Sequence, residues 1–274
     1  MSVTACDIRY EIEDIHCATA SELGRIADEV APLVKDVTGL ALPQQPVIRL
    51  LPRDAFAREI TGHLLRALAR DVTELGLHEG IATALHNDVV APLLDDSVWT
   101  TCTGMALRSA DGHVQVVLCP ANLSAAGYTT ASTYYQLLAF QLVHLAVRHA
   151  APQVAALCDS PAGLVRGHDP RALAALTSGH AAWATDIILS RLAAAEPASP
   201  CPVPRCAPAP HWSGLPQQAT HSDARGRAFI DRIRRTPGGP AALTRMWTSP
   251  HLAPRTLDEL ACPDRWLART AAHH

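Results

Sequence analysis

The segment from Tyr134 to His149 constrains the fold more than any other part of the chain. It contains no proline or glycine, and its apolar residues recur at helical spacing. The segment therefore predicts a helix of about four turns. Its apolar side chains are numerous, which is typical of a helix packed in a protein core, so other elements must supply the surfaces that cover it.

Most other segments also have helical patterns, and a few have the composition of strands. Asp111-Gly112, between two β-rich runs, is typical of a hairpin turn. The expected elements, in chain order, are a helix over 21–37, a strand over 47–51, a helix over 54–68, an interrupted helical region over 75–96, strands over 101–108 and 113–118, and helices over 134–149, 170–189, 225–235, 240–247 and 256–268. These patterns predict an α+β fold, mostly helical, with a small antiparallel sheet or hairpin.

Composition and charge exclude several classes of partner. The formal net charge is -3 and no long basic stretch occurs, which argues against nucleic acid, because phosphate binding needs clustered cations. No apolar run approaches the roughly 20 residues that cross a membrane. The first residues have neither a basic start nor an apolar core, so no signal peptide is expected. We therefore expect a cytoplasmic protein whose 8 cysteines are mostly reduced thiols.

One turn of the central helix has the register of a metal site. In Phe140-Gln141-Leu142-Val143-His144, the first and last positions share a helix face, as the two histidines of a His-Glu-x-x-His zinc motif do. The glutamate of that motif activates the metal-bound water. Only His144 retains the required residue type, so the alternative is an ordinary core helix with one histidine.

Three stretches resemble a zincin-fold metallopeptidase of the gluzincin type, as found in small bacterial zinc peptidases. The first is Phe140–His144, preceded by the predicted hairpin that would form the substrate-side edge strand. The second, Ser178-Gly179-His180-Ala181-Ala182-Trp183-Ala184, is similar to the family segment that begins Glu-Gly and supplies the third zinc ligand. The third, Pro254–Asp264, is similar to the family's C-terminal Thr-x-Glu segment. The resemblance spans about residues 20–270 and implies a zincin-like fold.

The resemblance places three of the family's four functional positions on residues of other types. The first ligand falls on Phe140, the base on Gln141, the second ligand on His144 and the third ligand on Ser178. Phenylalanine has no donor atom, glutamine cannot act as a general base, and a neutral serine is a poor zinc ligand. We therefore expect no metal here, no cofactor and no standard peptidase activity. His180 completes the candidate cleft as a further polar group.

A looser zinc pattern occurs in and after a Pro-rich segment. Cys201 and Cys206, followed by His211 and His221, have a spacing at the wide end of structural zinc sites. The alternative is a flexible loop that contains thiols. The sequence leaves both interpretations open.

The chain is expected to divide into two subdomains. Residues 1–155 would hold the sheet and the turn Phe140–His144, which we call the metal-helix position. Residues 156–274 would be helical, with a Pro-rich loop at about 196–216.

Two main hypotheses for the function follow. The first is a pseudoenzyme that binds a peptide or protein in the former active-site cleft, which predicts an open groove beside the hairpin. The second is a repurposed, metal-independent enzyme of peptide or natural-product tailoring, which predicts a closed, mostly apolar pocket for a small molecule with His144 at its base. A hydrolase with a rebuilt metal site is a further alternative.

Overall fold

The computed structural model describes residues 7–10, 17–94, 96–195 and 216–271. In chain order the elements are β1 (Asp7–Tyr10), α1 (Cys17–Thr38), β2 (Val47–Leu50), α2 (Arg53–Leu75), α3 (Glu79–Leu85), η1 (His86–Val90), η2 (Ala91–Leu94), η3 (Asp96–Thr101), β3 (Gly104–Arg108), β4 (Val114–Leu118), α4 (Pro120–Ala125), α5 (Ala131–Ala150), α6 (Pro152–Cys158), α7 (Pro170–Ala195), α8 (Pro216–Arg235), α9 (Gly239–Thr248), η4 (Pro250–Leu252), α10 (Leu257–Ala261) and α11 (Pro263–Ala271). The predicted mostly helical α+β fold is confirmed.

The strands form one small mixed sheet in the order β1-β2-β4-β3. β3 and β4 pair in antiparallel fashion and confirm the predicted hairpin, whose turn contains Gly112 at φ 85°. β1, β2 and β4 run parallel to one another, so the expected antiparallel pairing holds for the hairpin alone. β1 was missed because a strand of 4 residues carries too few alternations for a periodic signal.

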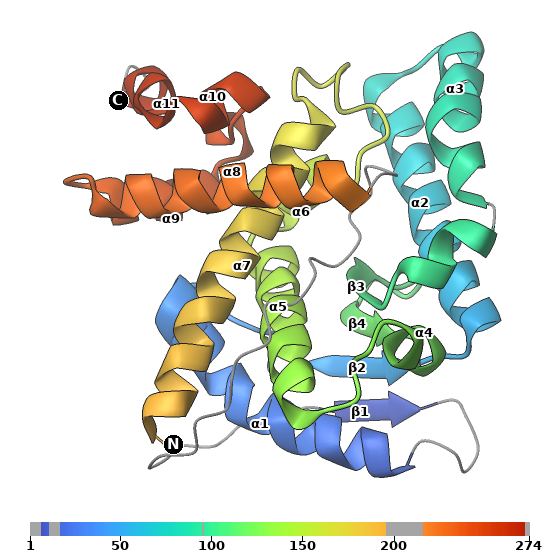
Figure 1. The fold of residues 1–274 in the computed structure, drawn as a ribbon. Helices are drawn as coiled ribbons and strands as arrows, with labels where there is room; N and C mark the ends of the chain where they lie inside the picture. Colours follow the sequence, from blue (N-terminus) through green and yellow to red (C-terminus); the bar gives the residue numbers. More distant parts are fainter. Residues whose placement is uncertain (1–6, 11–16, 95, 196–215, 272–274) are drawn as a thin grey trace.

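Helices cover both faces of the sheet (Figure 1). α1 and α5 pack on one face, where Val116 and Leu118 of β4 join the larger hydrophobic core. α2 packs on the other face, where Val117 of β4 joins a second core. The alternation of neighbouring β4 residues between the two cores follows from the two-residue period of a strand.

The N-terminus of α5 is fixed by a capping box. Thr130 accepts a hydrogen bond from the backbone N–H of Thr133, and the Thr133 side chain accepts one from the backbone N–H of Thr130. Arg148 and His149 lie in the last turn, where cations suit the helix dipole. Pro152 then starts α6 at a position that needs no N–H donor. Local signals thus set both ends of the central helix.

α7 packs beside α5 and is crossed by α8 (Figure 1). At the crossing the two backbones touch through a pair of glycines. A Cβ on Gly179 would lie 2.2 Å from the backbone N of Arg227, and a Cβ on Gly226 would lie 1.7 Å from the carbonyl oxygen of Ala175. Only glycine permits this approach, so the pair fixes where α8 lies on α7.

The Pro-rich loop expected at about 196–216 lies outside the described residues, except for Pro216, which begins α8. The subdomain division at residue 155 stays a prediction. The larger core contains residues from both sides of it, including Leu142 of α5 and Trp247 of α9. Within the described part of the chain, no helix is long and apolar enough to cross a membrane.

Replacing Gly226 with alanine is expected to destabilise the protein by about 1–3 kcal/mol or more, because the helices must separate to admit the methyl group. Urea unfolding measures the change. Gly80→Ala on α3 is the matched control: its Cβ would meet only His78 Nδ1, at 3.6 Å, so we expect a neutral or slightly stabilising effect. Equal effects of the two substitutions would contradict the close helix crossing.

Candidate functional site

The metal-helix position lies on the side of α5 that faces the edge strand β3. Gln141 is buried, at 3% exposure, and its side-chain amide donates a hydrogen bond of 3.1 Å to the carbonyl oxygen of Gly104 in β3. Phe140 and His144 are half-buried, and their rings meet edge to face with centroids 4.7 Å apart. The residue at the general-base position therefore holds a helix against a strand.

The chemistry of this contact requires an amide. A carbonyl oxygen accepts hydrogen bonds, and the NH2 group of glutamine donates one, whereas an ionised glutamate could only accept. Gly104 brings its backbone close to its neighbours, since a Cβ there would lie 2.3 Å from the Leu118 side chain. Gln141 is thus suited to its structural contact and unsuited to activating water.

Side chains cap two backbone carbonyls on the outer edge of β3. The backbones of Ser109 and Thr103 bond to the two residues that flank β4, His113 and Cys119. The alternate residues Gly104 and Arg108 therefore point their carbonyls away from β4. Gln141 donates to the first of these carbonyls. His63 Nδ1 and Arg66 Nη2 of α2 both lie 3.1 Å from the second. Strand addition by a peptide along β3 would have to displace these contacts.

Ser178, at the third-ligand position, lies in α7 next to the glycine crossing. It is 2% exposed, and its neighbour Gly179 is in contact with the backbone of α8. The packing of α8 on α7 therefore encloses this position.

His180 lies in an aromatic environment built from three helices. Its ring is 4.9 Å from that of Trp247 and stacks on that of Trp183 at 6.0 Å, and Arg234 lies over the Trp183 ring. Among the described residues, no group hydrogen-bonds His180 Nδ1. Burial, helped by the nearby charge of Arg234, lowers the pKa of His180 to about 3. The ring is therefore neutral at physiological pH.

The candidate cleft residues thus share two packed helices but differ in environment. Phe140 and His144 are partly accessible, whereas Gln141, Ser178 and His180 are buried. Within the described ranges, no cluster of three or more His, Cys, Asp or Glu residues could hold a metal ion.

The looser zinc pattern stays a prediction. Cys201, Cys206 and His211 lie outside the described residues. His221 lies within α8, but its side chain is not among those described.

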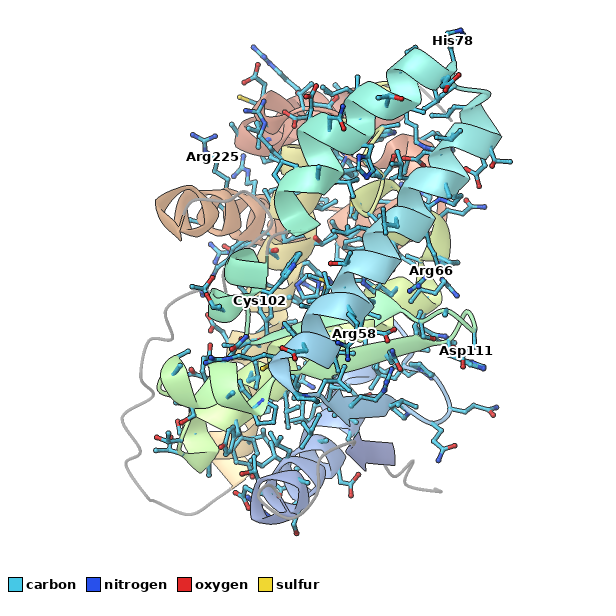
Figure 2. The ribbon with its side chains drawn as sticks, turned by 90° about the vertical axis from the view of Figure 1, so that its right-hand side faces the viewer. Arg58, Arg66, His78, Cys102, Asp111 and Arg225 are labelled. Atoms are coloured by element: carbon cyan, nitrogen blue, oxygen red, sulfur yellow. The ribbon has the colours of Figure 1, made fainter. Side chains whose placement is uncertain are left out.

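A cavity of about 250 Å³, which the sequence did not suggest, lies beside the hairpin turn. Its walls come from α2, the β3–β4 turn, the end of α5, and α6 with the residue that follows it. Figure 2 shows α2 lying across the hairpin, with Arg66 and Asp111 near one another. The charged and titratable residues of the lining are His63, Arg66, Arg70, Arg108, Arg148 and Asp159.

Three of these residues, Arg148, Asp159 and His63, form a polar cluster that is largely shielded from solvent. Arg148 donates hydrogen bonds of 2.5 and 2.7 Å to the two carboxylate oxygens of Asp159, and His63 Nε2 lies 3.1 Å from one of them. Burial alone would raise the pKa of Asp159, but Arg148 and His63 outweigh it and hold the pKa well below its usual value. Asp159 is therefore ionised, and its charge is balanced within the cluster.

The cavity also contains Ser109, so the residue types of a hydrolytic triad are present without its geometry. The Ser109 hydroxyl donates toward Asp111 and the carbonyl of His113. Both ring nitrogens of His63 face other oxygens, those of Arg108 and Asp159. His63 is therefore not placed to take the hydroxyl proton, and the Ser109 hydrogen bond lowers the pKa of Asp111, which makes that carboxylate a weak base. The cluster does not form a nucleophile of the serine-hydrolase type.

A weak sequence signal for this cavity exists in α2. His63, Arg66 and Arg70 follow one another at intervals of three and four residues, which places them on one helix face. Their partners come from three other segments, and only the tertiary structure brings these together.

Comparison with known proteins supports the fold alone. No protein-family model matches the chain, and no curated protein matches it either. A crystal structure from Chloroflexus aurantiacus, described as a "putative hydrolase with a novel fold", is similar at a TM-score of 0.60 and 16% sequence identity, over 95% of this chain and 92% of that chain. The similarity covers nearly the whole of both chains, so the two proteins share their overall architecture.

Gln141→Glu is expected to destabilise the protein by at least about 2 kcal/mol at neutral pH, because a buried carboxylate would face the Gly104 carbonyl. The penalty should shrink in acid, since a protonated carboxyl can donate to that carbonyl. Urea unfolding at pH 7 and pH 5 measures both effects. Gln141→Met, which removes the donor without adding charge, should cost about 1 kcal/mol and show no such pH dependence. A Gln141→Glu protein as stable as the wild type would contradict the conclusion that the Gln141 amide holds α5 against β3.

The buried, neutral state of His180 predicts a specific loss of stability in acid. Its folded pKa of about 3 lies below the unfolded value of 6.5, so the unfolded chain binds more protons between these limits. The contribution of the neutral His180 ring to the free energy of unfolding is complete above pH 6.5. It is lost as the pH falls, with a slope approaching 1.4 kcal/mol per pH unit. The unfolding free energy of the wild type minus that of His180→Leu should therefore fall from pH 7 to pH 5. A constant difference would contradict this account.

Proposed function

We propose that the protein is a catalytically degenerate, metal-free relative of zinc peptidases that binds a peptide or protein. The observation that carries the proposal is the hydrogen bond from Gln141 to Gly104, which commits the general-base position to a structural contact. The cytoplasmic location and the absence of a nucleic-acid partner belong to the same proposal and rest on the sequence.

The accessible part of the metal-helix position suits contact with side chains of a ligand. Phe140, His144 and Arg148 follow one another at four-residue intervals, share a face of α5 and are half-buried. An aromatic ring, an imidazole and an arginine that lines the cavity beside the hairpin therefore lie in one row. The row supports recognition through side chains, because the capped carbonyls of β3 oppose strand addition.

The position of the cavity favours binding over the tailoring hypothesis. Tailoring requires a closed, mostly apolar pocket with His144 at its base. The cavity beside the hairpin carries six charged or titratable side chains in its lining and does not include His144. The open, peptide-sized groove beside the hairpin that the binding hypothesis expects stays a prediction.

A hydrolase is the second candidate. The description of the structural neighbour as a "putative hydrolase" is the observation that favours it. In this chain it would require metal ligands other than those of the family motif.

Binding at the α5 row is tested with a library of short fluorescent peptides and the untagged protein. We expect zinc well below one per chain, no peptide hydrolysis, and saturable binding of some peptides. His144→Ala should weaken that binding about tenfold, because it removes a central contact of the row. Fluorescence polarisation measures affinity, and elemental analysis measures zinc.

His149→Ala is the matched control, since His149 lies on the same helix but is exposed and outside the row. Its affinity should equal that of the wild type. Stoichiometric zinc that is lost with His144→Ala, together with hydrolysis, would establish the hydrolase instead. Peptide binding that both variants weaken equally, or no peptide binding at all, would overturn the proposal.

A further inference from the structure

Three guanidinium groups converge on the cavity beside the hairpin. Arg66 and Arg70 come from successive turns of α2, and Arg108 ends β3. Arg66 Nη2 donates to the carbonyl of Arg108 at 3.1 Å, so α2 and the hairpin are in direct contact at the cavity wall. In Figure 2, Arg66 lies near the hairpin turn that carries Asp111.

The positive charges of these groups are poorly balanced. Arg66 and Arg108 donate to backbone carbonyls, those of Arg108 and Gly112. A carbonyl satisfies a donor but cancels no charge. Asp159 is the one carboxylate among the lining residues, and Arg148 already holds it through two hydrogen bonds.

Arg70 is the least satisfied of the three. Its Nη2 donates to the carbonyl of Ala156, but its Nε is buried and lacks a hydrogen-bond partner among the described residues. The nearest carboxylate, Asp71, lies 3.6 Å away and is bound more closely by Arg166, at 2.8 Å. A buried N–H without an acceptor is costly, so the hydrogen-bonding capacity of the Arg70 guanidinium is not used up by the protein.

Repulsion between the charges of Arg66 and Arg70 also favours binding of an anion between them. Arg66 and Arg70 are four residues apart on one helix face, an arrangement that repels and destabilises a helix. A bound anion would convert the repulsion into attraction to a shared partner. Guanidinium groups suit oxyanions in particular, because their planar forks bond to two oxygens at once.

We propose that this cavity binds the phosphate group of a small phosphate monoester, held by Arg66, Arg70 and Arg108. A phosphate dianion matches several unbalanced cations better than a carboxylate, which carries one charge. The volume of about 250 Å³ is below the roughly 300–1,000 Å³ of drug-sized sites, so the ligand is small. Ala67, Val114 and Ala155 supply apolar lining for the ester's carbon skeleton. The inference is independent of peptide binding at His144.

The test is isothermal titration calorimetry of the full chain with inorganic phosphate, with glycerol phosphate and with acetate. All titrations use one ionic strength, adjusted with chloride, because electrostatic binding is salt-dependent. The variants are Arg66→Gln and Arg70→Gln. Arg58→Gln is the matched control, since it removes one charge from an exposed position of the same helix that does not line the cavity (Figure 2).

Both phosphates should bind, and more tightly than acetate. Each cavity variant should weaken phosphate binding about tenfold or more, because a charge-assisted hydrogen bond is lost, and Arg58→Gln should change it less than about twofold. Tighter binding of glycerol phosphate than of inorganic phosphate would identify the ester as the ligand, and equal binding would identify the free anion.

Three results would overturn the proposal. These are no phosphate binding by the wild type, acetate binding as tight as that of phosphate, and equal weakening by Arg58→Gln. Circular dichroism checks that each variant is folded. If Arg70→Gln fails to fold, because it borders the buried Asp71, the exposed Arg66→Gln decides the question.

Discussion

The burial of α5 between the sheet, α1 and α7 is the constraint around which the described structure is arranged. A helix with apolar side chains on most of its faces must be covered on most of its faces, and each covering element here is placed by contact with it. The sheet contributes one face through β3 and β4, and α1 and α7 contribute the others. Within this arrangement Gln141 points into the covering layers and holds α5 to β3, whereas Phe140 and His144 are only half-buried.

Local patterns in the sequence were enough to predict the elements that depend on local interactions. The helix around His144 followed from its spacing and its lack of proline, and the β3–β4 hairpin followed from Asp111-Gly112 between β-rich runs. β1 and the short helix α4 were missed, because each has too few residues to express a period. The parallel pairing of β1, β2 and β4 was also missed, because strand order is decided by packing between distant segments.

The candidate site was predictable only in part, for the same reason. The helical register placed Phe140, Gln141 and His144 correctly on one helix, but only the neighbouring strand reveals that Gln141 acts as a donor to Gly104. The cavity beside the hairpin is lined at one side by α6 and Asp159, and a buried carboxylate holds the loop that follows Asp159. Asp71 of α2 accepts hydrogen bonds from Ser160, from the backbone of Ala162 and from Arg166. Four donors to one carboxylate offset much of the cost of its burial, and no periodic pattern encodes such a network.

The capped edge of β3 has a consequence for how this protein behaves at high concentration. An open strand edge with free backbone groups is a template on which another chain can build, and this is a common start of aggregation. Here the amide of Gln141 closes one end of that edge, and His63 and Arg66 close the other. Natural sheets often protect an edge with a bulge, a proline or a lysine. In this sheet the protecting side chains come from α5 and α2, the helices packed on its two faces. These side-chain contacts thus also protect the sheet edge against self-association.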